Sequence, residues 1–146
     1  MLVFVLFGAM VAFADPKAPA SPEDVLNVAK GFGTANLEAF NNGDPKISGR
    51  LDGAKYEVFF LGCTENKNCN NMQLTAGWAL SESKKITLDK IDEWNRTKRF
   101  GKAFLDPKGN PRLEMDLPIV GVSTPYLERV FEWWQVGLRA FREHIQ

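Results

Sequence analysis

The chain opens with an uninterrupted apolar run. Thirteen of the first fourteen residues are apolar and none is charged. The run is shorter than the roughly 20 residues that a membrane-spanning helix needs, and it ends on Ala12 and Ala14, small residues at the two positions that a signal peptidase reads. We expect residues 1–14 to be a cleaved signal peptide, residues 15–22 a short leader and residues 23–146 a single domain. The alternative, a buried amino-terminal helix, is disfavoured because no polar face interrupts the run.

Start and stop signals, combined with a helical period, predict two short helices. Ser21 is a typical N-cap, Pro22 suits the first helical position, and Gly31 ends the helix. Apolar residues of this helix fall on one face: Val25, Leu26, Ala29 and Phe32. Thr87 caps a second helix that runs to about Lys98. Its apolar residues recur at every third position: Leu88, Ile91 and Trp94.

The longest predicted helix opens at Thr124-Pro125 and runs to the end of the chain. Its apolar residues are spaced four and three apart in turn, which forms a sustained stripe: Leu127, Phe131, Trp134, Leu138, Phe141 and Ile145. Trp133 widens this stripe. Neighbouring helical positions point about 100° apart, so Trp133 and Trp134 cannot easily face the same core. We expect one of the two rings to serve a dimer or partner surface.

The pattern between the helices has a period of two, which is typical of strands with one buried face. Turn residues divide it into predicted strands at residues 36–40, 46–51, 54–61 and 72–80, followed by a hairpin of residues 100–106 and 112–117. Strands joined in sequence order by short turns form an antiparallel meander. The predicted order is α-β(meander)-α-β-β-α, an α+β domain in which helices pack on a twisted antiparallel sheet.

Composition and charge exclude several classes of function. The 18 basic and 18 acidic side chains balance, whereas nucleic-acid-binding domains usually carry a basic excess, so we expect no nucleic-acid partner. The single histidine, His144, rules out a histidine-rich metal site, and the dipole of the last helix explains its position. Glu114 and Asp116 share a strand face, which we interpret as a solvated face. Because no phosphate-binding loop, nucleophile elbow or dinucleotide fingerprint occurs, we predict a protein that is not an enzyme and needs no cofactor or metal.

The two cysteines, Cys63 and Cys69, bracket the connection between two predicted strands. Behind a signal peptide the compartment is oxidising, which favours a disulfide. Closing so short a loop stabilises the fold by about 2 kcal/mol in the entropic model. The alternative is a redox-active pair, but the cysteines lack the Cys-x-x-Cys spacing that lowers a thiol pKa.

Aromatic and basic residues interleave where the second helix meets the following strand. The candidate binding residues of this segment are Trp94, Asn95, Arg96, Arg99 and Phe100. They could form a corner that binds an anionic ligand or a peptide. Alternatively, the two aromatic rings belong to the core, the asparagine amide bonds to the backbone, and the cations are solvated. The pattern alone leaves both interpretations open.

Several short motifs occur in a fixed order along the chain. They are residues 47–53 (ISGRLDG), residues 56–63 (YEVFFLGC), Cys69, residues 72–77, residues 93–95 (EWN), residues 99–103 (RFGKA) and residues 113–117 (LEMDL). Together they resemble the YbjN family, which is described as bacterial sensory transduction regulators. The resemblance covers about residues 23–145. It implies a fold similar to that of type III secretion chaperones, which are often dimeric, and it implies no catalytic residues.

The resemblance and the expected export signal together lead to a functional hypothesis. We expect an exported bacterial protein, periplasmic or secreted, that binds a protein or peptide as a chaperone-like or regulatory module. Trp133 and Trp134 join the corner residues as candidate contacts, and a homodimer is a further expectation. After cleavage of the signal peptide, the protein is not expected to be an integral membrane protein. The alternative is a periplasmic protein that holds a small molecule or lipid between its sheet and its helices.

Overall fold

The computed structural model describes residues 18–81 and 84–146 of the chain. Within them the elements follow the predicted order, which is confirmed. The helices are α1 (Pro22–Lys30), α2 (Leu88–Thr97) and α3 (Thr124–His144), and the strands are β1 (Thr34–Ala39), β2 (Pro45–Leu51), β3 (Ala54–Leu61), β4 (Asn71–Gly77), β5 (Lys102–Leu105) and β6 (Pro111–Pro118). The expected signal peptide, residues 1–14, and the first part of the expected leader lie outside the described residues.

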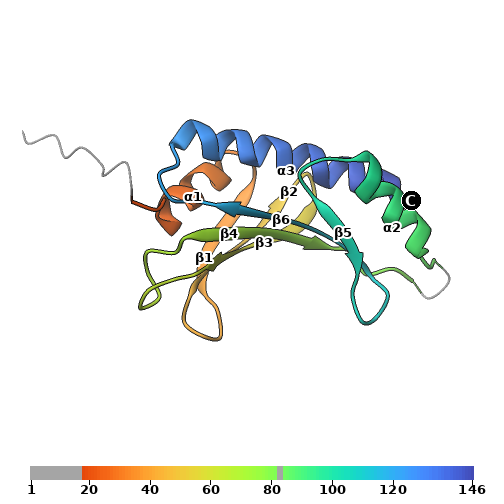
Figure 1. Ribbon diagram of the computed structural model, residues 1–146, viewed down its shortest axis with the longest axis horizontal. Coiled ribbons are helices and arrows are strands. Elements are labelled where there is room, and N and C mark those ends of the chain that lie inside the picture. The colour runs from red at the N-terminus through yellow and green to blue at the C-terminus, as the bar shows by residue number, and fades with distance from the viewer. Residues whose placement is uncertain (1–17, 82–83) are drawn as a thin grey trace, which may run out of the picture.

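The described strands form one antiparallel sheet in the order β1-β2-β3-β4-β6-β5. The first four strands are neighbours in sequence order, as in a meander, and the β5–β6 hairpin joins them through the pairing of β6 with β4. The three helices lie on one face of the sheet, where α3 runs along it and α1 and α2 sit near its two ends (Figure 1). The other face carries no helix from the described part of the chain.

Side-chain alternation explains why the helices gather on one face. In β2 and β3 the paired residues Ile47 and Val58 are fully buried under the helices, whereas the next pair, Ser48 and Glu57, lies on the opposite face. Helix α3 supplies the facing surface. All members of its predicted apolar stripe are buried: Leu127, Phe131, Trp134, Leu138, Phe141 and Ile145. Because each fully buried large apolar side chain contributes about 1.5–3 kcal/mol, this layer dominates the stability of the fold.

The helix starts follow the capping signals, with one correction at α3. Ser21 caps α1, and its hydroxyl accepts a hydrogen bond from the Asp24 N–H at 3.1 Å. The predicted cap of α2, Thr87, is confirmed. Helix α3 opens at Thr124-Pro125 as predicted, but Pro125 is not its first residue, because the cap is Ser123, whose hydroxyl accepts from the Tyr126 N–H at 3.3 Å. The proline therefore takes the second helical position, where a missing N–H costs nothing.

Two strands of the meander end elsewhere than predicted. β1 begins at Thr34, directly after α1, and ends before Phe40, because the Phe40 N–H donates to the Asp44 carbonyl and closes the turn. β4 was predicted to reach residue 80 but ends at Gly77. Trp78 keeps one backbone hydrogen bond to β6, and its ring packs on Phe141 of α3 at 5.2 Å between centroids.

Helix α2 exposes one residue that the pattern placed on its buried face. Ile91 and Trp94 are buried, but Leu88 is 73% exposed. A spacing of three residues falls short of a full turn by about 60°, so Leu88 lies about 120° around the helix from Trp94. A strict three-residue repeat therefore cannot keep all three side chains on one face.

The turn between β2 and β3 is tied to α3 through Asp52. Its carboxylate accepts from the Arg139 guanidinium at 2.6 Å and from the Gln135 amide at 3.2 Å. The Arg142 guanidinium donates to the Asp52 carbonyl at 3.1 Å. The Arg139 hydrogen bond is the main reason why the pKa of Asp52 lies below its usual value. The turn itself has φ of 51° at Asp52 and 80° at Gly53, as the Asp-Gly hairpin signal predicts.

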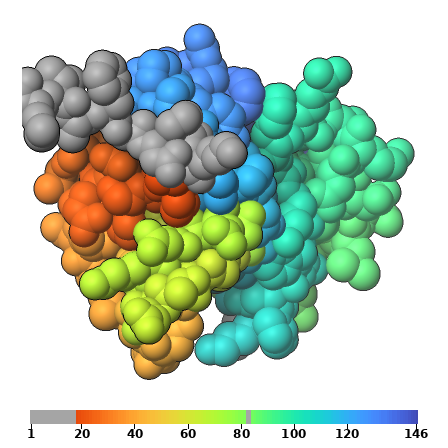
Figure 2. Space-filling view, turned by 60° about the vertical axis from the view of Figure 1, so that its left-hand side comes forward, coloured from red at the N-terminus to blue at the C-terminus, as the bar shows by residue number. Residues whose placement is uncertain are grey.

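The predicted disulfide between Cys63 and Cys69 is present and closes the connection from β3 to β4. This connection, drawn in yellow-green, lies at the surface beside α1 (Figure 2). Within it, the Asn66 amide donates to the Asp44 carboxylate at 2.8 Å. The disulfide therefore holds a loop that also fixes the β1–β2 turn.

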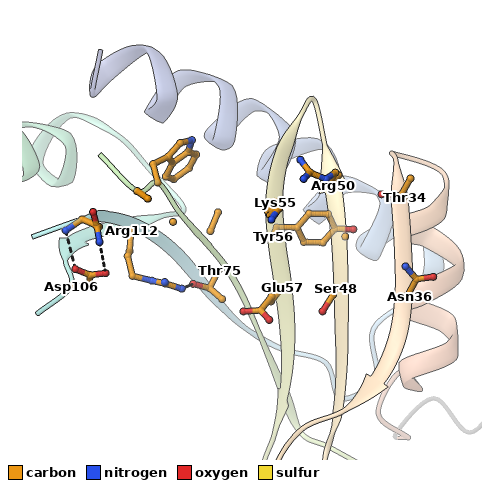
Figure 3. Close-up of a pocket in the computed structure, with 16 residues that line it drawn as sticks. Thr34, Asn36, Ser48, Arg50, Lys55, Tyr56, Glu57, Thr75, Asp106 and Arg112 are labelled. Carbon is orange, nitrogen blue, oxygen red and sulfur yellow. Dashed lines mark hydrogen bonds between the residues drawn. The ribbon is translucent and has the colours of Figure 1, made fainter. Parts of the chain in front are cut away.

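The pairing of β3 with β4 stops before either strand ends. Its last pair is Glu57 with Thr75, although β3 starts at Ala54 and β4 continues to Gly77. The backbones diverge beyond this pair (Figure 3). The sheet is therefore divided at one end into a β1-β2-β3 part and a β4-β6-β5 part.

Candidate functional site

Five of the seven candidate binding residues line one cavity on the helix side of the sheet. The cavity has a volume of about 270 Å³ and lies between the end of α2, the α2–β5 connection, β6 and α3. We call it the α2–α3 pocket. Its lining residues are Trp94, Lys98, Arg99, Phe100, Gly101, Leu113, Met115, Trp133, Trp134, Val136, Gly137 and Ala140. Asn95 and Arg96, the other two candidates, do not line it.

Trp94 and Asn95, at the end of α2, bond to the segment that leads into β5 and so position this wall of the pocket. Trp94 is 2% exposed, and its indole N–H donates to the Gly101 carbonyl at 3.2 Å. The Asn95 side chain donates to the Ala103 carbonyl at 3.0 Å and accepts from the Ala103 N–H at 2.8 Å. These bonds fix the α2–β5 connection to the helix. For these two residues the structure therefore shows the core and backbone contacts that were the alternative interpretation.

Phe100 and Trp133 form the mouth of the pocket. Their rings stack with centroids 4.3 Å apart and planes 13° apart. Phe100 is 56% exposed and Trp133 is 38% exposed, so the alternative that Phe100 belongs to the core is wrong. The predicted strand also starts at Lys102 instead of residue 100, because Phe100 has a φ of 68° and turns the chain. A bulky residue in this left-handed region is uncommon and costs about 1–2 kcal/mol.

The two adjacent tryptophans of α3 separate as the helical geometry requires. Trp134 is fully buried and Trp133 is the exposed one. The Trp134 indole N–H is also buried, and it donates no hydrogen bond to any described residue. An unpaired buried donor costs about 1–3 kcal/mol. Because Trp134 lines the pocket, a bound group with an acceptor oxygen that reaches this N–H would recover that cost.

The rim of the pocket is basic. Lys98 and Arg99 line it, and the lining includes no carboxylate. The Lys98 ammonium lies 6.0 Å from the centroid of the Trp94 ring. Arg99 has no carboxylate within 4.0 Å among residues 18–81 and 84–146. Arg96, by contrast, bonds to Asp92 at 2.8 Å on the surface of α2 and contributes no charge to the rim.

A second cavity, of about 590 Å³, lies on the open face of the sheet, where β3 and β4 diverge. We call it the sheet cleft. Polar side chains of five strands surround it, among them Asn36, Ser48, Glu57, Thr75 and Arg112 (Figure 3). Sequence reasoning missed this site because its residues follow the alternation of any strand with one solvated face. Only the register shows that they converge.

Other titratable groups have structural partners. The Lys102 ammonium lies 3.3 Å from Glu114 and 3.5 Å from Asp116, and these carboxylates raise the pKa of Lys102. The His144 Nε2 lies 2.7 Å from the Lys90 carbonyl, to which it donates, and so joins the end of α3 to α2. The segments 18–81 and 84–146 contain no cluster of three His, Cys, Asp or Glu side chains suited to a metal ion. Within the same segments, no helix has both the length and the apolar character to cross a membrane.

Residues 21–146 match the YbjN family, whose description reads "Putative bacterial sensory transduction regulator". Among solved structures, the chain is similar to the Yersinia pestis type III secretion chaperone SycH, determined in complex with a stable fragment of YscM2. The two are 15% identical, the similarity covers 77% of this chain and 91% of the SycH chain, and the TM-score is 0.51. This level of identity supports a common fold only. No curated protein sequence matches the chain.

Proposed function

Because the chain belongs to the YbjN family, we propose that it is a regulatory or chaperone-like binding protein of the bacterial envelope, without enzymatic activity, that holds a peptide segment of a partner in the α2–α3 pocket. One observation carries the proposal. The mouth of an apolar cavity has the stacked, partly exposed rings of Phe100 and Trp133 beside two cations, Lys98 and Arg99, and no carboxylate lines this cavity. Exposed apolar surface beside unpaired charge is typical of a binding surface.

The pocket chemistry indicates what the bound segment carries. Leu113, Met115 and Val136 offer an apolar wall suited to one aromatic or large aliphatic side chain. Lys98 and Arg99 at the rim favour a carboxylate next to that anchor, because a guanidinium and a carboxylate form strong paired hydrogen bonds. We therefore infer an acidic peptide with a single apolar anchor residue.

The SycH fold supports binding of this kind. SycH was determined with a protein fragment bound, so a fold similar to this one can hold a segment of another protein. The position of the segment on this chain is inferred from the α2–α3 pocket and not from SycH. The α2–α3 pocket is lined mainly by α3 and the α2–β5 connection, with two residues from β6 and one from α2.

Export is the second part of the proposal. It is supported by the apolar run of residues 1–14 and by the Cys63–Cys69 disulfide, a bond typical of oxidising compartments. Expression of the full chain in a bacterial host, followed by fractionation and mass measurement, tests it. We expect a protein that begins at Asp15 in the periplasmic or secreted fraction, with both thiols oxidised. An uncleaved, reduced protein in the cytoplasm would contradict export.

Binding can be tested with three short model peptides: one with a phenylalanine flanked by aspartates, one with serine in place of the phenylalanine, and one with asparagines in place of the aspartates. Calorimetry measures binding to each variant, and the intrinsic fluorescence of the four tryptophans reports it in the wild-type protein. We expect the first peptide to bind and each of the other two to bind at least five-fold more weakly. In Trp133→Ala the affinity falls, whereas Leu61→Ala, which removes an equally exposed side chain far from the pocket, leaves it unchanged.

Two outcomes would refute peptide binding in the pocket. One is equal affinity for the three peptides, and the other is an equal effect of Trp133→Ala and Leu61→Ala. Native mass spectrometry of the purified protein addresses the small-molecule or lipid alternative. A recurrent bound aliphatic acid that the first peptide cannot displace would favour that alternative.

A further inference from the structure

The sheet cleft contains three cations and two carboxylates, and the carboxylates are already engaged. The cations are Arg50, Lys55 and Arg112, and the carboxylates are Glu57 and Asp106. The Glu57 carboxylate accepts from the Lys46 ammonium at 2.9 Å. Lys46 does not line the cleft, so this ion pair offsets one of the two negative charges from outside.

Asp106 is engaged by the β5–β6 turn. Its carboxylate accepts from the backbone N–H groups of Lys108 and Asn110 at 2.8 and 2.9 Å, and from the Asn110 side chain at 3.3 Å. These bonds lower the pKa of Asp106, with Arg112 as a smaller contributor. The hydrogen-bonding capacity of this carboxylate is thus used within its own turn (Figure 3).

Arg112 is held across β4 toward the centre of the cleft. Its guanidinium donates to the Thr75 hydroxyl at 2.9 Å, and Thr75 itself is 2% exposed. Gly77 makes room for the guanidinium, because a Cβ there would lie 3.0 Å from the Arg112 Nη1. Figure 3 shows the extended side chain of Arg112 running to Thr75. No carboxylate of the described chain lies within 4.0 Å of Arg112, so its other N–H groups stay available.

Arg50 and Lys55 approach the cleft from the other half of the sheet. They are a cross-strand pair of β2 and β3 on the open face. The Arg50 guanidinium makes one bond to the Gly53 carbonyl at 3.3 Å. Lys55 forms neither a hydrogen bond nor an ion pair with any described residue. Like charges directly opposite each other in a sheet are unfavourable, so this pair gains from a bound negative charge.

From this arrangement we propose that the sheet cleft binds a small multivalent anion, with phosphate or carboxylate oxygens, between Arg112 on β6 and the Arg50–Lys55 pair. The volume of about 590 Å³ falls within the usual range for small-ligand sites. A planar guanidinium fixed by Thr75 presents its free N–H groups in the geometry that carboxylates and phosphates prefer. The diverging edges of β3 and β4 leave a gap into which such a ligand fits. This site lies on the opposite face of the sheet from the α2–α3 pocket.

Nuclear magnetic resonance titration of the purified, isotope-labelled protein with citrate and, separately, with pyrophosphate tests the proposal. We expect saturable shifts of the backbone amides of Lys55, Thr75 and Gly77 with at least one of the probes. Saturation by citrate only assigns the site to carboxylates, and saturation by pyrophosphate only assigns it to phosphates. Lack of saturation by either probe at 10 mM, or shifts spread over the whole surface, would overturn the proposal.

Three variants locate the anion. Arg112→Gln and Lys55→Gln should each weaken binding at least five-fold. Lys55 is exposed and bonds to no described residue, so its replacement leaves the fold intact even if the Arg112 variant loses stability. Lys108→Gln removes the same charge from the exposed tip of the β5–β6 turn and should change the affinity less than two-fold. Equal weakening by Lys55→Gln and Lys108→Gln would show general charge attraction instead of a site.

Discussion

The conformation of Phe100 leads to a prediction about stability that reverses the usual order of alanine and glycine. At most positions within helices and strands, alanine is more stable than glycine by about 0.5–1 kcal/mol. Phe100 has a φ of 68°, where a residue with a Cβ pays about 1–2 kcal/mol and glycine pays almost nothing. Phe100→Ala and Phe100→Gly both lose the stacking on Trp133. We therefore expect the glycine variant to be more stable than the alanine variant by about 0.5–1 kcal/mol.

The comparison with the wild-type protein follows from the same contributions. Removal of the ring costs about 0.5–1.5 kcal/mol of aromatic stacking, in addition to its half-buried apolar surface. Release of the left-handed strain offsets much of this loss in Phe100→Gly but not in Phe100→Ala. Phe100→Gly should thus lie within about 1 kcal/mol of wild type while it loses affinity for the acidic phenylalanine peptide. A residue that adds little stability but is required for binding would explain why a bulky ring occupies a strained position.

Urea denaturation, followed by circular dichroism, measures these differences in the free energy of unfolding. All variants are fitted with the same dependence of this free energy on urea concentration. Glu128, exposed in the second turn of α3, provides the control, because Glu128→Gly should be less stable than Glu128→Ala by about 1 kcal/mol. The reasoning is refuted if Phe100→Ala is at least as stable as Phe100→Gly while the control pair shows the normal order. In that case Phe100 would not be held in the left-handed conformation in solution.

Three further predictions concern the rest of the fold. Gly49→Ala should destabilise the protein by about 1–3 kcal/mol in urea denaturation, because a Cβ there would clash with the Thr34 backbone carbonyl and would lie 2.7 Å from the ring of the cross-strand tyrosine; an unchanged midpoint would contradict this packing. Replacement of Cys63 and Cys69 by serine should cost about 2 kcal/mol, and a reductant should destabilise the wild-type protein but not the variant. The pKa of Asp52 is lowered in the fold, so its contribution is present above pH 3.8 and is lost as the pH falls through the folded pKa. The Tm difference between wild type and Arg139→Gln should therefore narrow between pH 5 and pH 2, and a constant difference would contradict the role of this ion pair.

Local patterns of the sequence were sufficient to predict the element order and most of the core. The caps Ser21 and Thr87, the Asp-Gly turn and the apolar stripe of α3 each depend on residues close together in the chain. The errors occur where contacts with residues outside the element determine where that element begins or ends. The period of two predicts a strand from Phe100, but the bonds of the preceding helix to residues 101 and 103 hold the chain in a turn there.

The sequence predicted the two segments that form the α2–α3 pocket but not their contact with each other. Trp133 and Trp134 had to diverge, and Trp94 to Phe100 stood out as an aromatic and basic segment. That these two segments meet is a tertiary fact, set by the packing of the end of α2 against α3. The sheet cleft left no signal of its own, because Arg50, Lys55 and Arg112 become neighbours only through the register and the separation of β3 from β4.

Strand β6 has a consequence for how the two faces of the protein communicate. Its consecutive residues Arg112 and Leu113 point to opposite sides of the sheet, so one lines the sheet cleft and the other lines the α2–α3 pocket. If a ligand on one face displaced this strand, the lining residue on the other face would move with it, because the two residues are adjacent in the chain. Thermodynamic linkage then requires that citrate change the affinity for the peptide by the same factor by which the peptide changes the affinity for citrate. Through this shared strand, binding of an anion in the sheet cleft would regulate binding of a protein partner in the α2–α3 pocket.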